Sequence, residues 1–149
     1  MLFGDARKEF LGKLDLPAIE RAIHEAEKAT TGEIRVAVLP PFRGSVEEMT
    51  EKTAHRLGMT KTTHRNAVLI LVDPRRRTFR VWGDRAIHEK VGAEHWKANA
   101  SAVAERFRAG DFTGGLFHGV AAAGKALAEH FPCGPEGHRG ELPDAVDVA

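Results

Sequence analysis

The chain has 149 residues, of which 42% are hydrophobic and 29% are charged, and its formal net charge is +1. These values are ordinary for a single soluble globular domain that is large enough to bury a core, and they exclude strong attraction of the whole surface to polyanions. We therefore expect no nucleic-acid partner, although Arg75, Arg76 and Arg77 form a local basic run.

The single cysteine and the first residues of the chain predict a cytoplasmic location. Cys133 has no second cysteine with which to form a disulfide in the chain, which fits a reducing cytoplasm. Residues 1–5 become charged at once and contain no apolar signal region. The longest apolar run, residues 67–72, is far too short to span a membrane. We expect a soluble, cytoplasmic protein without a membrane segment.

The first part of the chain predicts helix, strand and helix. Residues 5–12 are expected to form a short helix or turn. Apolar residues at helical spacing predict a helix over about 16–31, with Asp15 as its N-cap. Alternating apolar residues predict a strand over 33–39. A capping box, S-V-E-E, begins the helix predicted over 45–57.

The middle of the chain predicts the sheet. Residues 67–72 are apolar without alternation, as in a strand that is buried on both faces. A strand–helix–strand order predicts a right-handed parallel crossover from the first strand. The turn at 73–77 is too short for a crossover, so the strand predicted at 78–82 should pair antiparallel. The fold class is therefore α/β, a small mixed sheet sandwiched by helices, with residues 67–72 at its centre.

The last part of the chain predicts two helices and a tail. The helices are expected over about 93–109 and 112–131, with Gly110 between them. Glycine and alanine leave the second helix slim enough to pack close to a neighbour. Residues 132–149 contain many helix breakers and few apolar residues, so we predict a disordered tail and a domain over 1–131.

Five blocks in this order resemble one known family. The blocks are T-G-E-I-R-V at 31–36, R-N-A-V-L-I at 65–70, G-D at 83–84, a helix that carries Trp96, and G-D-F-T-G-G-L at 110–116. Together they resemble the TPM domain family over about residues 15–131. That family includes plant thylakoid-lumen proteins of photosystem repair, an animal receptor modulator and many bacterial proteins. The resemblance implies an α/β sandwich fold.

The resemblance implies more than one function, because fold alone does not determine activity. Some members are described as acid phosphatases and others as calcium binders. Ala67, Arg85 and Ala86 stand where members often have glycine, which alters the site if those glycines let the backbone approach a ligand. Many members also carry a signal peptide and a C-terminal membrane helix, so the chain is interpreted as a stand-alone soluble version.

Four polar residues are predicted to meet at one end of the sheet: Glu33, Asn66, Asp84 and Asp111. Glu33 starts the first strand, Asn66 starts the parallel second strand, and Asp84 ends the antiparallel third strand. Asp111 reaches the same end if the last helix starts there. Carboxylate and amide oxygens suit hard cations, so we predict a site for Ca²⁺ or Mg²⁺, with Ca²⁺ preferred.

Simpler roles for these residues remain open. Asp84 and Asp111 are each suited to cap a helix, and Glu33 could pair with Arg35 or Arg65. Asp73, which precedes three arginines, could serve phosphate chemistry, although a solvated turn is the favoured interpretation.

Other site types have weaker support in the sequence. The eight histidines do not form the H-E-x-x-H pattern of zinc enzymes, so most are expected on the surface or in the core. The glycine-rich stretch at 110–115 could hold an anion at a helix start, although close helix packing is favoured.

Two functions from different classes compete. In the favoured interpretation the domain binds a cation and acts as a binding or interaction module. In the alternative it is a metal-dependent phosphatase that hydrolyses phosphomonoesters. The acidic cluster offers no spare general base, and His64 is the one nearby imidazole. The expected partner is another protein or a small phosphate ester, no organic cofactor is predicted, and we expect a monomer.

Overall fold

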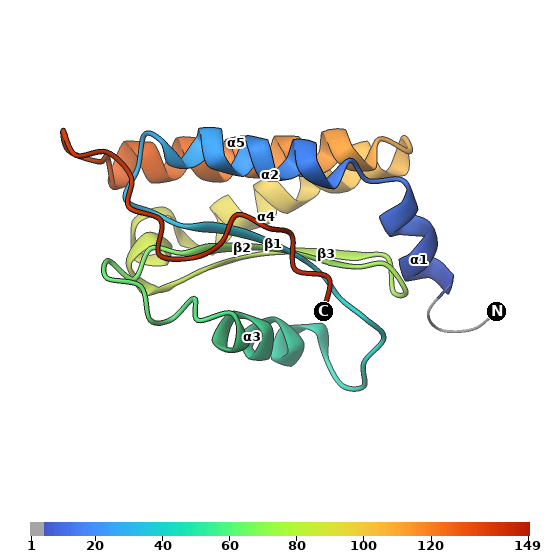
Figure 1. Cartoon of the computed structure of the whole chain (residues 1–149). Coiled ribbons are helices and arrows are strands. Elements are labelled where there is room, and N and C mark those ends of the chain that lie inside the picture. The colour runs from blue at the N-terminus through green and yellow to red at the C-terminus, as the bar shows by residue number, and fades with distance from the viewer. Residues whose placement is uncertain (1–4) are drawn as a thin grey trace.

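The computed structural model describes residues 5–149, which form five helices and one three-stranded sheet (Figure 1). This arrangement confirms the predicted α/β class. The elements in chain order are α1 (Asp5–Gly12), α2 (Leu16–Glu27), β1 (Ile34–Val38), α3 (Val46–Arg56), β2 (Val68–Asp73), β3 (Thr78–Gly83), α4 (Arg85–Arg108) and α5 (Phe112–His130).

The sheet has the predicted strand order and directions. β2 lies between β1 and β3, pairing parallel with β1 and antiparallel with β3. Val68 marks the register, because it lies opposite Ile34 on one side and Gly83 on the other. Every residue of β2 is buried, which explains why its sequence is apolar without alternation.

Helices cover both faces of the sheet, as Figure 1 shows. α2, α4 and α5 cover one face, and α3 covers the other. Alternate residues of each strand therefore enter two separate cores. In β1, Val36 packs toward α2 and α5, while Ala37 packs in the smaller core on the side of α3.

α2 and α5 lie side by side and run in the same direction (Figure 1). Near their starts, the Asp15 amide donates to Thr113 Oγ1 at 3.2 Å. Near their ends, the Thr30 hydroxyl donates to the Phe131 carbonyl at 2.6 Å, and the Thr31 amide donates to the same carbonyl at 3.0 Å. The start of α5 therefore lies far from the chain segment that leads into β1.

Two helix boundaries differ from the sequence prediction. α2 ends at Glu27 rather than near residue 31, because Thr30 leaves the helix to pair with Pro132. α4 begins at Arg85 and is kinked at Gly92, whose φ of +79° suits glycine. None of the helices described between residues 5 and 149 is long and apolar enough to cross a membrane.

The segment after α5 returns along the outer edge of β1 (Figure 1, red). The Asp147 amide donates to the Val36 carbonyl at 2.8 Å, and the Val38 amide donates to the Asp147 carbonyl at 2.9 Å. Val146 beside it is 7% exposed and belongs to the larger core. The disorder predicted for this segment in solution stays a prediction, and the exchange experiment described below tests it.

Candidate functional site

Three of the four predicted ligands lie at one end of the sheet. The Val68 amide donates to the Glu33 carbonyl at 2.8 Å, and the Asp84 amide donates to the Ala67 carbonyl at 2.8 Å. These bonds bring Glu33, Asn66 and Asp84 to the same edge, as the strand directions predicted. Asp111 lies at the other end, because α5 starts there.

The Asp84 carboxylate is held by a two-point ion pair with Arg65. Both of its carboxylate oxygens accept hydrogen bonds from Arg65, at 2.6 Å from Nε and 3.0 Å from Nη2. Asp84 holds the N-cap position of α4, yet among the described residues its side chain makes no capping hydrogen bond. Arg65 adopts a left-handed backbone conformation with φ +52°, and the bidentate pair fixes the junction between β3 and α4.

Asn66 and Asp111 each make local contacts that do not include the other predicted ligands. Asn66 is fully buried and donates from Nδ2 to Thr31 Oγ1 at 3.1 Å, while its Oδ1 has no hydrogen-bond partner among the described residues. Asp111 caps α5 by accepting from the Gly114 amide at 2.9 Å, and Arg106 lies 3.7 Å away. Asp111 thus has the capping role that the sequence left open.

Glu33 instead lies close to Glu27 and His138, two residues that are not among the four predicted ligands. Glu33 Oε2 lies 3.4 Å from His138 Nε2, and Glu27 Oε1 lies 3.6 Å from the same nitrogen. One ligand atom from each residue falls within 4.8 Å of the other two. Glu27 and Glu33 are 2% and 0% exposed. The three residues form what we call the Glu–Glu–His cluster.

Backbone contacts orient every member of the Glu–Glu–His cluster. The Ile34 amide donates to Glu27 Oε2 at 2.8 Å, and the Glu141 amide donates to Glu33 Oε1. His138 Nδ1 lies 2.8 Å from the Thr30 carbonyl, which can only accept, so Nδ1 carries the proton. In the neutral ring, Nε2 then presents a lone pair. Glu33 Oε2 and His138 Nε2 have no hydrogen-bond partner among residues 5–149.

When no cation is nearby, burial shifts both carboxyl groups toward their neutral forms. The pKa of Glu27 is raised to about 10, chiefly by burial and also by the neighbouring Asp144 and Glu33, while the Ile34 amide opposes the shift. Burial also raises the pKa of Glu33, although the amide of Glu141, the carboxyl group of Glu27 and the imidazole of His138 oppose this. A divalent cation would replace protons here and balance the two negative charges.

Only one of the two missed residues had a signal in the sequence. Ile19, Ile23 and Glu27 follow at intervals of four, so Glu27 falls on the apolar face of α2. A carboxyl group at a core-facing position needs a partner, and that need could have drawn attention to it. His138 lies in a segment rich in glycine and proline, where no periodicity predicts its neighbours.

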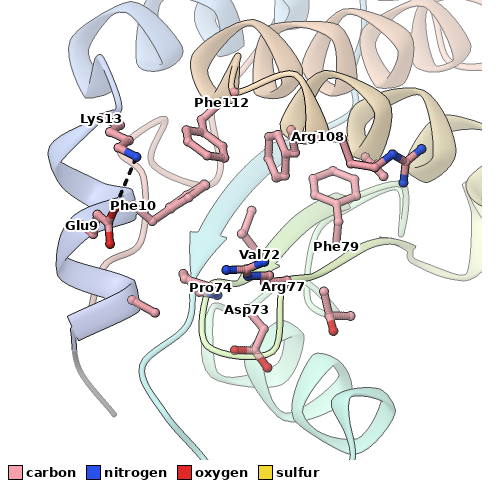
Figure 2. Close-up of a pocket in the computed structure, with 15 residues that line it drawn as sticks. Glu9, Phe10, Lys13, Val72, Asp73, Pro74, Arg77, Phe79, Arg108 and Phe112 are labelled. Atoms are coloured by element: carbon pink, nitrogen blue, oxygen red, sulfur yellow. Dashed lines mark hydrogen bonds and ion pairs between the residues drawn. The ribbon is translucent and has the colours of Figure 1, made fainter. Parts of the chain in front are cut away.

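A cleft of about 640 Å³ lies at the opposite end of the sheet, between α1, the β2–β3 turn and the α4–α5 junction (Figure 2). Phenylalanine rings in edge-to-face contact form one wall. The Asp73 carboxylate points away from these rings, is 1% exposed, and accepts from the Arg76 amide at 3.3 Å. Asp73 therefore stabilises the turn. The rings are those of Phe10, Phe79, Phe107 and Phe112.

Comparisons with known proteins agree on a single relationship. The family model described as TPM domain matches residues 7–126. The NMR structure of the BA42 protein from the psychrophilic bacterium Bizionia argentinensis is similar, with a TM-score of 0.83 and 35% sequence identity. The similarity covers 90% of this chain and 92% of that one. No curated protein matches the chain.

Proposed function

The chain belongs to the TPM domain family, and on that premise we propose that it is a binding module that holds a divalent cation between Glu27, Glu33 and His138. One observation carries the proposal: the fully buried Glu33 Oε2 faces the lone-pair nitrogen of His138 without a hydrogen bond. Two facing acceptors in a buried site are costly unless a proton or a cation lies between them.

The spacing of the cluster suits a metal ion. Ligand atoms bound about 2.1 Å from a tetrahedral ion lie roughly 3.4 Å apart. The two distances to His138 Nε2, 3.4 Å and 3.6 Å, are close to this value. The hydrogen bond from His138 Nδ1 to a backbone carbonyl is also the usual outer contact of a metal-binding histidine, because it holds the ring and its tautomer.

The imidazole nitrogen of His138 changes which divalent cation the site is expected to prefer. The oxygen ligands predicted from the sequence favour Ca²⁺ and then Mg²⁺. Imidazole nitrogen suits Zn²⁺ and other transition ions, whereas Ca²⁺ and Mg²⁺ prefer oxygen. The proposal therefore keeps a divalent cation and places Zn²⁺ first.

Burial favours a binding role over the phosphatase alternative. A metal-dependent phosphatase needs an ion with a position that a phosphate ester can reach. Glu27 and Glu33 are at most 2% exposed, and the returning C-terminal segment lies over them. We expect no hydrolysis of a generic aryl phosphate with Zn²⁺, Mg²⁺ or Ca²⁺. Hydrolysis of the aryl phosphate by the original chain, lost in Glu33→Gln, would show that the protein is an enzyme rather than a binding module.

Calorimetric titration of the full chain tests the proposal. After removal of metal with a chelator, Zn²⁺, Mn²⁺, Ca²⁺ and Mg²⁺ are titrated in separate runs at pH 7.5. We expect one Zn²⁺ per chain, with weaker binding of Ca²⁺ and Mg²⁺. His138→Ala and Glu33→Gln should each weaken the binding of Zn²⁺ at least about tenfold, because each removes a ligand.

Three control variants make this test specific. His64→Ala removes an exposed imidazole, while Asp84→Asn and Asp111→Asn alter the carboxylates that were first predicted to bind the ion. All three should keep the affinity of the original chain. Absence of Zn²⁺ binding, or affinity lost in Asp111→Asn and kept in His138→Ala, would contradict the proposed site.

A further inference from the structure

One ligand of the proposed centre comes from the C-terminal segment, outside the residues that the family model matches. We infer that the bound ion fastens residues 138–147 over the outer edge of β1, and that loss of the ion opens this edge to an extended peptide whose sequence pattern is apolar then acidic. The inference rests on the proposed function, since it assigns a role to the same ion.

The ion would join parts of the chain that are far apart in sequence. Glu27 ends α2 and Glu33 precedes β1, so both belong to the body of the domain. His138 and Glu141 belong to the returning segment, and the Glu141 amide contacts Glu33 directly. Removing the ion takes away the charge that all three side chains would share. The junction then keeps only the contacts of Glu33 with His138 and with the Glu141 amide, which are weaker than ligation to a cation.

Beyond this junction the segment pairs with β1 as an added strand would. Asp147 uses its amide and carbonyl to bond Val36 and Val38, while Arg35 Nη2 donates to the Ala145 carbonyl at 3.1 Å. Main-chain hydrogen bonds of this kind form with peptides of many sequences, so they supply affinity for any extended peptide. Pockets for side chains determine which peptide sequence is preferred.

Two side-chain contacts define the preferred peptide. Val146 is 7% exposed and fills a position in the larger core. The neighbouring Asp147 carboxylate is held by Arg56 Nη2 at 2.6 Å. An apolar residue followed by an acidic one, in an extended conformation parallel to β1, therefore fits this edge. A partner protein would supply such a segment when the chain's own segment is released.

Amide hydrogen exchange of the full chain tests the fastening step. We compare the amides of Val38 and Asp147 in Zn²⁺-loaded protein and in protein kept free of metal by a chelator. We expect exchange of both amides to be at least about tenfold faster without the ion, because opening the segment becomes easier. The amide of Ile70 in the central strand serves as the internal reference and should keep its protection.

A labelled peptide with the sequence of residues 143–149, P-D-A-V-D-V-A, tests the docking step by fluorescence anisotropy. We expect binding to metal-free protein and displacement by Zn²⁺. His138→Ala should bind the peptide with or without Zn²⁺. A peptide with Asp147→Ala should bind the metal-free protein more weakly, because it lacks the carboxylate that Arg56 Nη2 holds.

The outcomes separate this inference from the proposed function. Calorimetric binding of Zn²⁺ with unchanged exchange at Val38 and Asp147 would overturn the fastening while the metal centre stands. Faster exchange without any peptide binding would overturn the docking of a partner. Absence of Zn²⁺ binding in calorimetry would remove the proposed function itself.

Discussion

At the scale of single residues, the most unusual feature is a carboxyl group on the core-facing side of α2. Glu27 is 2% exposed and faces Glu33 and His138, with Asp144 close by. Such a group is stable only with a proton, a cation or a strong donor beside it. The donor that Glu27 has, the Ile34 amide, satisfies one oxygen and leaves the other for the cluster.

Glu27→Gln should change how the stability of metal-free protein depends on pH. The folded-state pKa of Glu27 is raised to about 10, so between its unfolded value and that pKa the folded chain holds a proton that the unfolded chain lacks. Stability from this group is therefore present at acidic pH and is lost as pH rises toward 10. Glutamine cannot ionise, so the variant should be more stable at pH 8, by on the order of 1–3 kcal/mol.

Urea unfolding at pH 5 and pH 8, with a chelator present, measures the effect. The two proteins should differ little at pH 5 and clearly at pH 8. Glu25→Gln on the exposed side of α2 is the matched control and should show no such gain. A Glu27→Gln protein that is less stable than the original chain at pH 8 would show that Glu27 is not protonated in the folded state.

At the scale of elements, the packing of α2 against α5 depends on a missing side chain. A Cβ atom at Gly124 would lie 2.8 Å from the Cβ of Ala26, closer than carbon atoms approach in folded proteins. Both atoms sit on helices, so relief requires a shift of one whole helix. The parallel approach of α2 and α5 also positions Thr30 and the segment that leads to Glu33.

Gly124→Ala should therefore destabilise the fold, although alanine favours helix by about 1 kcal/mol relative to glycine. Overpacking of this kind costs about 1–3 kcal/mol, so we expect a lower melting temperature. Gly12→Ala is the control, since a Cβ there meets nothing within 4 Å, and it should be neutral or stabilising. Thermal unfolding by circular dichroism measures both. An unchanged melting temperature for Gly124→Ala would contradict the close approach.

At the scale of the whole molecule, the domain buries its apolar side chains in two cores and covers one sheet edge with its own C-terminal segment. A covered edge cannot pair with another chain, which is a common way to avoid aggregation. Among the described residues, Phe117 and Val148 are the exposed large hydrophobic side chains. Exposed hydrophobic side chains such as these are common on monomeric proteins.

The Zn²⁺-loaded chain should be a monomer, as the sequence analysis also predicted. Sedimentation velocity at concentrations from about 10 to 300 µM, a range in which weak dimers with micromolar Kd become visible, measures this. The metal-free chain provides the comparison, since an open β1 edge can pair with the released segment of another copy. A concentration-dependent dimer in the presence of Zn²⁺ would contradict the prediction.

The sequence alone predicted the sheet and the helices that cover it. The apolar run at 67–72 marked the central strand, and the short turn at 73–77 required antiparallel pairing with the next strand. Periodicity, caps and short connections are local, and local patterns carry this information directly. They also brought Glu33, Asn66 and Asp84 to one end of the sheet, because strand direction follows from the order of the elements.

The membership of the candidate site was decided by tertiary structure. Asp111 lies away from the other predicted ligands because α5 runs parallel to α2. No local sequence pattern predicts that direction. Asp84 has its oxygens bound by Arg65, and His138 reaches Glu27 and Glu33 only because the C-terminal segment returns along β1. Contacts between residues 27, 33 and 138 depend on how distant segments pack, whereas the sequence specifies each segment largely through its near neighbours.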